Sequence, residues 1–329
     1  MGAADAHTSP MSTAPATSLI PERSTRLPNL AFKWAAALAA GMIVVLIVFV
    51  GWELYVGSKA AIVKFGPGFL WSSQWNPVED RYGALPFIFG TLASSMIALL
   101  IAVPLGVATA LFLTELAPLK VRQPIVMAIE MLAAVPSVIF GLWGFFVLIP
   151  WLRMHLFAWL EHSFGFLPLF KGPVYGVSML AAGIVVAIMI LPIITSISRE
   201  ILRSVPNLQR EAAYALGATR WEVLRIAVLS YARRGLFGAA ILGLGRALGE
   251  TMAVTMVIGN RPEISASLLA PGYTLASVIA NEFTEATTDL YLSSLFELGL
   301  VLLAVTILVN VIAQIMVRSI TGTGPIKVY

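Results

Sequence analysis

The chain has 329 residues, of which 59% are hydrophobic and only 12% charged, with a formal net charge of +4. A soluble domain carries roughly twice that share of charged residues, so the composition excludes one. The chain has no cysteine, which excludes disulfides, thiol nucleophiles and Cys-based metal sites. We expect an all-α integral membrane protein, because the apolar runs are about 20 residues or longer, whereas barrel strands are about 10 residues with strict alternation.

The N-terminal segment differs in composition from the rest of the chain. Residues 1–29 are rich in Ser, Thr, Ala and Pro, and we expect a disordered cytoplasmic tail because such a segment buries too little apolar surface to fold. Residues 30–329 are expected to form one transmembrane domain of six spans, three of them kinked by Pro104, Pro136 and Pro192. The expected spans are Trp34–Val56, Leu85–Leu113, Pro124–Ile149, Tyr175–Ile197, Leu236–Ile258 and Tyr291–Val317.

Two further apolar stretches are expected to remain outside the hydrocarbon. Trp151–Phe170 is interrupted by an arginine, a glutamate and two histidines, whose burial would be costly, so we expect an amphipathic segment at the outer interface. Ile264–Ile279 is too short to span and contains Pro271 and Gly272. It is expected at the outer mouth between the fifth and sixth spans.

The loop at residues 198–234 carries seven of the chain's 21 Lys and Arg residues, and its pattern predicts a helix, a turn and a second helix. Its Lys and Arg content predicts a cytoplasmic loop and two cytoplasmic termini. Pro206 suits the start of a first short helix and Gly217 a left-handed stop. Thr219, with Glu222 three residues later, predicts a capping box that opens the next helix.

Glu211, Ala212 and Ala213, followed after three residues by Gly217, give this loop small side chains beside a carboxylate. From the residues alone, a basic loop that satisfies the positive-inside rule explains it equally well. The string and its place before the penultimate span resemble the EAA loop of ABC-importer permeases. The resemblance implies that the loop docks on a separate ATPase subunit and couples its closure to the spans. The family usually ends this pattern in Ile-x-Leu-Pro, but residues 227–230 read AVLS, which leaves the bend into the fifth span unsupported.

The chain contains no Gly-x4-Gly-Lys-Ser/Thr stretch to cradle nucleotide phosphates. We therefore expect no enzyme activity and no cofactor on this chain, with ATP and Mg on the partner ATPase. No metal site is expected either.

Ionisable residues inside the expected spans are candidate path residues. Arg246 and Glu250 in the fifth span are four residues apart, and on one helix they would share a face. An arginine at this depth costs about 2.5 to 3.5 kcal/mol and should face the bundle interior or a wet cavity. A guanidinium can donate two hydrogen bonds to an oxyanion, although a helix-packing pair is the alternative. Glu130 in the third span and Glu297 in the sixth serve packing or the path equally well.

Gly245 and Gly249 form a small-x3-small stripe in the fifth span. Such a stripe usually marks close helix contact, either within the chain or with a second subunit.

The strings GRALGETMAV at residues 245–254 and VPSVIFGLWG at residues 135–144 resemble PstC-type permeases of bacterial phosphate importers. This resemblance implies a type I ABC-importer permease fold in the bacterial plasma membrane, with Arg246 and Glu250 serving phosphate passage. It further implies a second permease of PstA type, a dimeric ATPase of PstB type and an external phosphate-binding protein of PstS type.

Three other functions stay open at this stage. A permease for sulfate, molybdate or phosphonate would share the EAA-like loop at residues 198–234. A gradient-driven secondary transporter would use the intramembrane carboxylates, but usually shows internal symmetry that this chain lacks. A membrane enzyme finds little support, because the three histidines all lie outside the expected spans.

Overall fold

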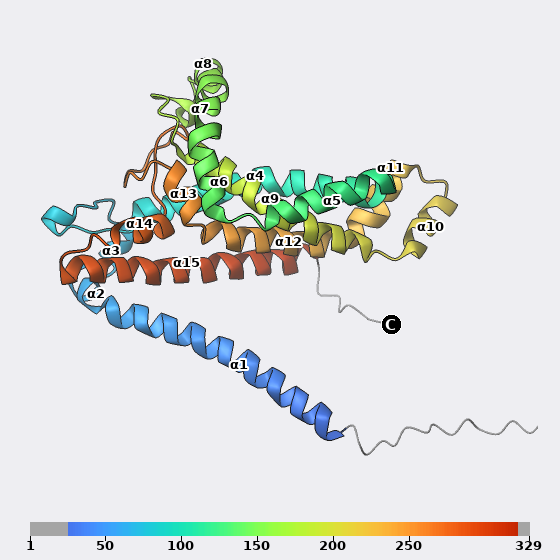
Figure 1. Ribbon diagram of the computed structural model, residues 1–329, viewed down its shortest axis with the longest axis horizontal. Coiled ribbons are helices and arrows are strands. Elements are labelled where there is room, and N and C mark those ends of the chain that lie inside the picture. The colour runs from blue at the N-terminus through green and yellow to red at the C-terminus, as the bar shows by residue number, and fades with distance from the viewer. Residues whose placement is uncertain (1–25, 322–329) are drawn as a thin grey trace, which may run out of the picture. The chain divides into compact units, whose positions relative to one another are not determined.

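The computed structural model describes residues 26–321, and helices make up most of that part (Figure 1). The chain divides into two units, residues 1–50 and 51–329. The predicted disordered tail lies largely outside the described residues, and α1 begins at Arg26 within it. The α-helices are α1 (Arg26–Gly57), α2 (Lys59–Phe65), α3 (Gly68–Trp71), α4 (Leu85–Leu111), α5 (Leu119–Ala133), α6 (Ser137–Trp143), α7 (Ile149–Leu152), α8 (Ala158–Phe164), α9 (Met179–Arg203), α10 (Asn207–Ala215), α11 (Arg220–Glu222), α12 (Ser230–Leu248), α13 (Met252–Val257), α14 (Leu275–Glu282) and α15 (Asp289–Thr321).

Four short π-helical stretches join several of these helices without a break. They are η2 (Phe112–Leu116) after α4, η3 (Gly144–Leu148) and η4 (Arg153–Phe157) between α6 and α8, and η6 (Val223–Leu229) between α11 and α12. A π turn adds one residue to a helical turn and so rotates the side chains that follow it.

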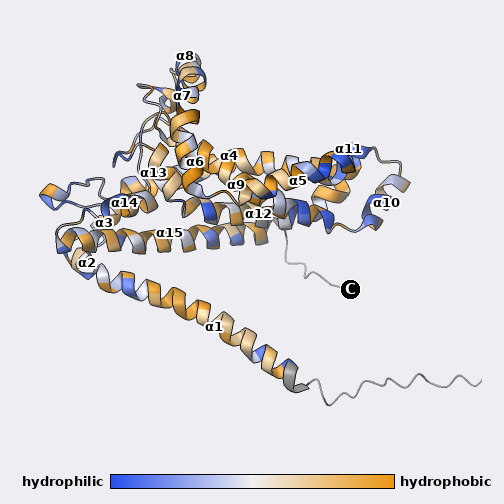
Figure 2. Ribbon diagram, in the orientation of Figure 1, coloured by the Kyte–Doolittle hydropathy of each residue, from blue (hydrophilic) through white to orange (hydrophobic). Residues whose placement is uncertain are grey.

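Six helical segments are long and apolar enough to cross a membrane, as the sequence predicted. Figure 2 shows hydrophobic residues along α1, α4, α9 and α15, whereas α10 and α11 are largely hydrophilic. The six segments are Asn29–Gly57, Leu85–Leu116, Ser137–Phe164, Met179–Arg203, Arg220–Leu248 and Asp289–Val317.

The third predicted span is wrong in its bounds. Pro124–Ile149 is divided, because α5 ends at Ala133 and a new helix begins after Pro136. A proline has no backbone N–H to continue the hydrogen-bond ladder and disfavours helical geometry in the residue before it. Figure 1 shows α6 to α8 running across the direction that α4, α9 and α12 share. The chain therefore turns sharply at Pro136.

The stretch Trp151–Phe170 is not the separate interfacial segment that we expected, because its residues up to Phe164 continue the helix that begins at Ser137. Its inner face joins the core through Leu152 and Phe157, which are buried. The charged and histidine side chains that argued against burial are all exposed. A 28-residue helix is about 42 Å long, so a span of about 30 Å leaves its charged end free to reach water.

Glycines bring α4, α9 and α12 into close contact. A Cβ added at Gly106 of α4 would lie 2.9 Å from Ile194 Cγ2 of α9, and one at Gly243 of α12 would lie 2.8 Å from Ile194 Cδ1. Gly183 of α9 likewise leaves no room beside Ile97. Small residues are the usual means by which membrane helices approach closely. Pro104 and Pro192 lie inside α4 and α9, as predicted.

An aromatic cluster joins α3, α4, α14 and α15 at the end of the bundle opposite α10. Trp75 Nε1 and the Tyr291 hydroxyl both donate to Glu282 Oε2, at 2.8 Å and 2.6 Å. The rings of Tyr82 and Tyr291 stack with centroids 5.6 Å apart. Burial raises the pKa of Tyr82, so this hydroxyl stays protonated at physiological pH. Residues 264–279 form a loop and part of α14 between the fifth and sixth spans, as expected.

We expect Gly90→Ala to destabilise the protein by about 1 to 3 kcal/mol, the usual cost of overpacking. An added Cβ at Gly90 would overlap the backbone oxygen of Tyr273, which cannot turn aside as a side chain would. Gly238→Ala is the matched control, because that helical glycine has nothing within 4 Å of its Cβ position. Thermal unfolding of the purified protein in mild detergent tests this. Equal stability of the two variants would contradict the packing described here.

Candidate functional site

The loop between α9 and α12 has the helix-turn-helix structure that the sequence predicted. Pro206 precedes α10 in extended conformation, and Gly217 ends it at φ +81°. The Gly217 N–H donates to Tyr214 O at 2.9 Å, closing the last turn. Thr219 and Glu222 form the expected capping box, in which Thr219 N donates to Glu222 Oε2 at 2.7 Å. Within the expected loop at residues 198–234, we call residues 204–222, from the end of α9 to the end of α11, the coupling loop.

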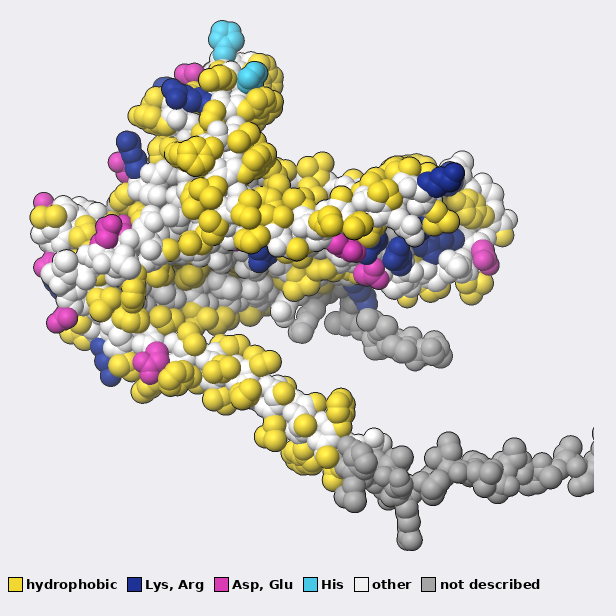
Figure 3. All heavy atoms as spheres, in the orientation of Figure 1, with side chains coloured by type: hydrophobic (Ala, Val, Ile, Leu, Met, Phe, Trp, Pro, Cys, Tyr) yellow, Lys and Arg dark blue, Asp and Glu magenta, His cyan; other side chains and the backbone are white. Residues whose placement is uncertain are grey.

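The coupling loop presents an unusual surface, because apolar and charged side chains are exposed together. Leu208, Leu216 and Trp221 are 74%, 90% and 63% exposed. Glu211 and Ala212 are exposed beside them, and Ala213 is half-buried. Figure 3 shows Lys and Arg side chains gathered at this end of the molecule. Exposed large apolar side chains that lie together are typical of a surface that contacts another protein, a membrane or a ligand.

The EAA pattern usually ends in a proline, and this chain has Ser230 at that position, inside a continuous helix. Residues 220–248 form one continuous helical run, in which the π stretch η6 leads directly into α12 at Ser230. The fifth span therefore begins without a break beside the coupling loop.

The fifth predicted span is interrupted near its C-terminal end, where the candidate path residues Arg246 and Glu250 lie. The helix stops at Leu248, and α13 begins at Met252. Glu250 lies in the break, buried, and its Oε1 accepts a hydrogen bond from Ala253 N at 3.2 Å. A carboxylate in this position caps the new helix, which a residue inside a continuous helix cannot do.

The prediction that Arg246 and Glu250 share a helix face is therefore wrong. Within residues 29–317, no ion pair joins the two side chains. Arg246 lies in the last turn of α12 and is exposed, where its charge complements the helix C-terminus. The break therefore places the two residues differently: Glu250 bonds to the backbone of α13, while Arg246 is exposed at the end of α12.

Gly245 and Gly249 leave an open surface around Arg246. A Cβ at Gly245 would have nothing within 4 Å, and one at Gly249 would meet only Gly245 O at 3.8 Å. The stripe is thus not a helix contact within the described part of this chain, whereas Gly243, on another face, packs against α9.

Glu130 and Glu297 have different surroundings. Glu130 lies on α5, outside the six candidate spans, and its Oε1 is 3.3 Å from Arg199 Nη2. The placement of Glu130 inside the third span is therefore wrong, because that span begins beyond Pro136. Glu297 lies on α15 and is buried, and its Oε2 has no hydrogen-bond partner among the described residues.

Sequence reasoning missed one ion pair at the coupling loop. Arg210 Nη2 lies 2.7 Å from Glu115 Oε1, and both side chains are mostly buried. In the sequence, Arg210 is one of several basic loop residues, and no motif singles out Glu115. No local sequence signal links two residues that are 95 positions apart.

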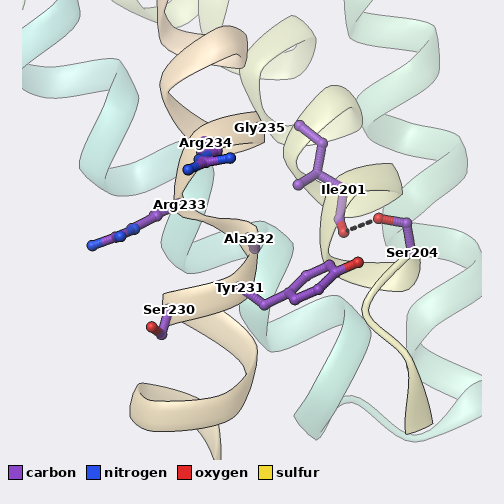
Figure 4. Close-up of a pocket in the computed structure, with 8 residues that line it drawn as sticks. All are labelled: Ile201, Ser204, Ser230, Tyr231, Ala232, Arg233, Arg234 and Gly235. Carbon is purple, nitrogen blue, oxygen red and sulfur yellow. Dashed lines mark hydrogen bonds between the residues drawn. The ribbon is translucent and has the colours of Figure 1, made fainter. Parts of the chain in front are cut away.

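A cavity of about 590 Å³ lies where α9 ends and α12 begins (Figure 4). Its wall on the α9 side includes Ser204, whose hydroxyl donates to Ile201 O at 2.8 Å. Its wall on the α12 side is formed by residues 230–235, which include two arginines. This end of α12 is therefore basic and accessible to solvent.

The chain is similar to known proteins both in sequence and in fold. The family model described as "Binding-protein-dependent transport system inner membrane component" matches residues 102–322. The chain is 48% identical to the phosphate transport system permease protein PstC of Mesorhizobium japonicum, over 91% of this chain and 92% of that one. It is 45% identical to PstC of Haemophilus influenzae, over 89% and 94%. A probable PstC of Methanocaldococcus jannaschii is 39% identical over 74% and 78%.

Solved structures share the fold at low sequence identity. A chain of a bacterial alginate ABC transporter, crystallised with its alginate-bound periplasmic protein, aligns with a TM-score of 0.54 and 16% identity, covering 90% of this chain and 98% of that one. A chain of the MetNI methionine ABC transporter in an inward-facing conformation aligns with a TM-score of 0.52 and 17% identity, covering 73% and 95%. The helices described above thus have the arrangement of ABC-importer permeases.

Proposed function

Because the chain belongs to the PstC family of binding-protein-dependent transport permeases, we propose that it is one membrane subunit of an ATP-driven importer of inorganic phosphate. Identity of 45% to 48% over nine-tenths of the chain supports the substrate assignment. The observation that carries the role is the coupling loop, a capped helical turn that exposes Glu211 near apolar side chains in a chain with six apolar segments.

The coupling loop is proposed to dock on a separate ATPase, which binds ATP and Mg. Glu211, Ala212 and Ala213 form the small, acidic part of the docking face, and Gly217 sets its turn. Leu208 and Leu216 provide apolar surface that a partner would remove from water. The orientation follows: the loop and both termini are cytoplasmic, in agreement with its arginines.

Phosphate passage is proposed to involve Arg246, at the open glycine face of α12. An arginine in an apolar span needs water, a ligand or a partner, and Arg246 is exposed with small residues on both sides. Its guanidinium suits transient recognition of a tetrahedral anion. Glu250 is proposed to fix the helix break beside it, and the buried Glu297 to border the path. Glu130 is instead proposed to hold α5 against α9 through Arg199.

The complete importer is proposed to contain a second, PstA-type permease, a PstB-type ATPase dimer and a PstS-type phosphate-binding protein outside the membrane. The open face at Gly245 and Gly249 supports a second permease, because small residues allow another helix to approach closely.

Copurification tests this assembly. The chain is extracted from its native membrane in mild detergent, and the bound proteins are identified by mass spectrometry. We expect a second permease and a protein with a Gly-x4-Gly-Lys-Ser/Thr loop, together with ATPase activity in the complex. Recovery of the chain alone, with no nucleotide-binding protein in any mild detergent, would contradict the proposal.

A further inference from the structure

We propose that Glu115 and Arg210 form a strut that fastens α10 to the ends of α4 and α9, so that α10 moves together with both helices. This inference rests on the proposed function, in which α10 contacts the ATPase. Glu115 and Arg210 are thus positioning residues that act through α10.

The helix α10 contacts the apolar stretch η6 but buries none of its own residues completely. Its surface includes exposed leucine and tyrosine side chains. Arg210 adds polar contacts, because its side chain bonds to acceptors at the ends of α4 and α9 at once. Loss of this side chain would remove the contacts that hold α10 to those two helix ends.

Arg210 bonds to both neighbouring helices. Its Nη2 donates to Glu115 Oε1 at 2.7 Å and to Leu202 O at 3.1 Å. Its Nη1 donates to Val205 O at 2.6 Å and to Asn207 Oδ1 at 3.3 Å. Leu202 O is one of the last carbonyls of α9, and it also accepts a long hydrogen bond from Val205 N at 3.4 Å. The guanidinium therefore ties the end of α9 to Glu115 in a fixed geometry that lysine could not match.

Glu115 is itself held in place. It lies in the π stretch η2 at the end of α4, where the added residue changes the direction in which its side chain points. Arg122 Nη2 donates to Thr114 O at 2.9 Å, beside Glu115. Thr114 Oγ1 in turn donates to Ala110 O at 2.9 Å. These hydrogen bonds fix the end of α4 and therefore the position of the Glu115 carboxylate, as the proposed connection between α4 and α10 requires.

Other ion pairs near this end differ in burial. The Glu115 and Arg210 side chains are 16% and 18% exposed, whereas those of Glu200 and Arg203 are 62% and 47% exposed. Exposed pairs contribute little, but a mostly buried pair is costly to break from one side. Only the buried one of these two pairs joins α10 to α4.

The test uses the complete importer with Glu115→Gln, Arg210→Gln and the double variant. Glu79→Gln is the matched control, because Glu79 pairs with Arg81 in an exposed ion pair far from α10. Two quantities are measured: hydrogen exchange of the α10 amides, and the number of ATP molecules hydrolysed per substrate molecule imported. Exchange in the core of α4 and α9 reports whether the variants fold.

Each single variant is expected to raise α10 exchange and the ATP cost of import by about tenfold, with core exchange unchanged. The double variant should show no greater α10 exchange or ATP cost than the more affected single variant, because each single substitution already removes the Glu115–Arg210 pair. Unchanged α10 exchange in both single variants, or losses that multiply in the double variant, would overturn the inference. Hydrogen exchange in α10 does not depend on which substrate is transported. A complex that fails to import phosphate would therefore refute the proposed function, while the exchange measurement would still test the Glu115–Arg210 strut.

Discussion

Glu211→Lys is expected to abolish phosphate uptake while leaving the chain folded and inserted. Glu211 is exposed on α10 and has no ion pair with any described residue, so its replacement costs the folded chain little. The cost falls on the docked ATPase, where a charge reversal in a contact surface typically amounts to several kcal/mol. We therefore expect the affinity of the ATPase for the permease to fall by about 100-fold or more. ATPase copurification and uptake in membrane vesicles measure the two effects.

Gln209→Lys is the matched control, since it adds a lysine to the same short helix at another exposed position. Uptake in this variant should stay within a few-fold of the unaltered importer. If Glu211→Lys retains full uptake and a bound ATPase, the coupling loop does not dock where we place it. Equal loss in both variants would show that any added charge on α10 is harmful and would remove the special role of Glu211.

Arg246→Gln is expected to lower phosphate uptake by about 10- to 150-fold, because a charge-assisted hydrogen bond contributes about 1.5 to 3 kcal/mol. The loss should appear in transport and leave assembly intact, since Arg246 forms no ion pair within residues 29–317. Arg246→Lys retains the charge but cannot donate two parallel hydrogen bonds, so its phosphate uptake should lie between that of Arg246→Gln and that of the unaltered importer. Uptake of radiolabelled phosphate, normalised to assembled complex, provides the measurement.

Arg233→Gln is the control for this second prediction, because it removes an exposed arginine from the same helix nearer the coupling loop. We expect it to retain most of the uptake. A normal rate in Arg246→Gln, with the complex assembled, would exclude Arg246 from the path and weaken the phosphate assignment.

The coupling loop was predictable because its signals are local. A left-handed glycine and a capping box each depend on residues close together in the chain, so the roles of Gly217, Thr219 and Glu222 could be predicted directly from the sequence. Six apolar segments were equally predictable, because length and hydropathy decide them.

The breaks in the third and fifth spans were not predictable from hydropathy. Both halves of each span are apolar, and a membrane helix often retains a proline, as α4 and α9 do at Pro104 and Pro192. At Pro136 the chain instead turns into α6, and at Glu250 a side chain caps a second helix. Whether a helix continues there depends on neighbours far away in the sequence.

The Glu115–Arg210 pair was missed for the same reason. Its partners lie on different helices and come together only after α4 and α9 have packed. The prediction for Glu130 failed because the helix breaks at Pro136. Glu130 therefore lies on α5, outside the third span, where it pairs with Arg199.

The most direct test of the account is transport by the purified complex in liposomes. The complex is reconstituted with its external binding protein, and radiolabelled phosphate uptake is followed with and without ATP, with sulfate and molybdate as competitors. We predict uptake that requires ATP, persists when ion gradients are collapsed, and is blocked by unlabelled phosphate but not by the other oxyanions. Uptake that needs a proton or sodium gradient and no ATP would contradict the account, and competition by sulfate or molybdate would contradict the substrate.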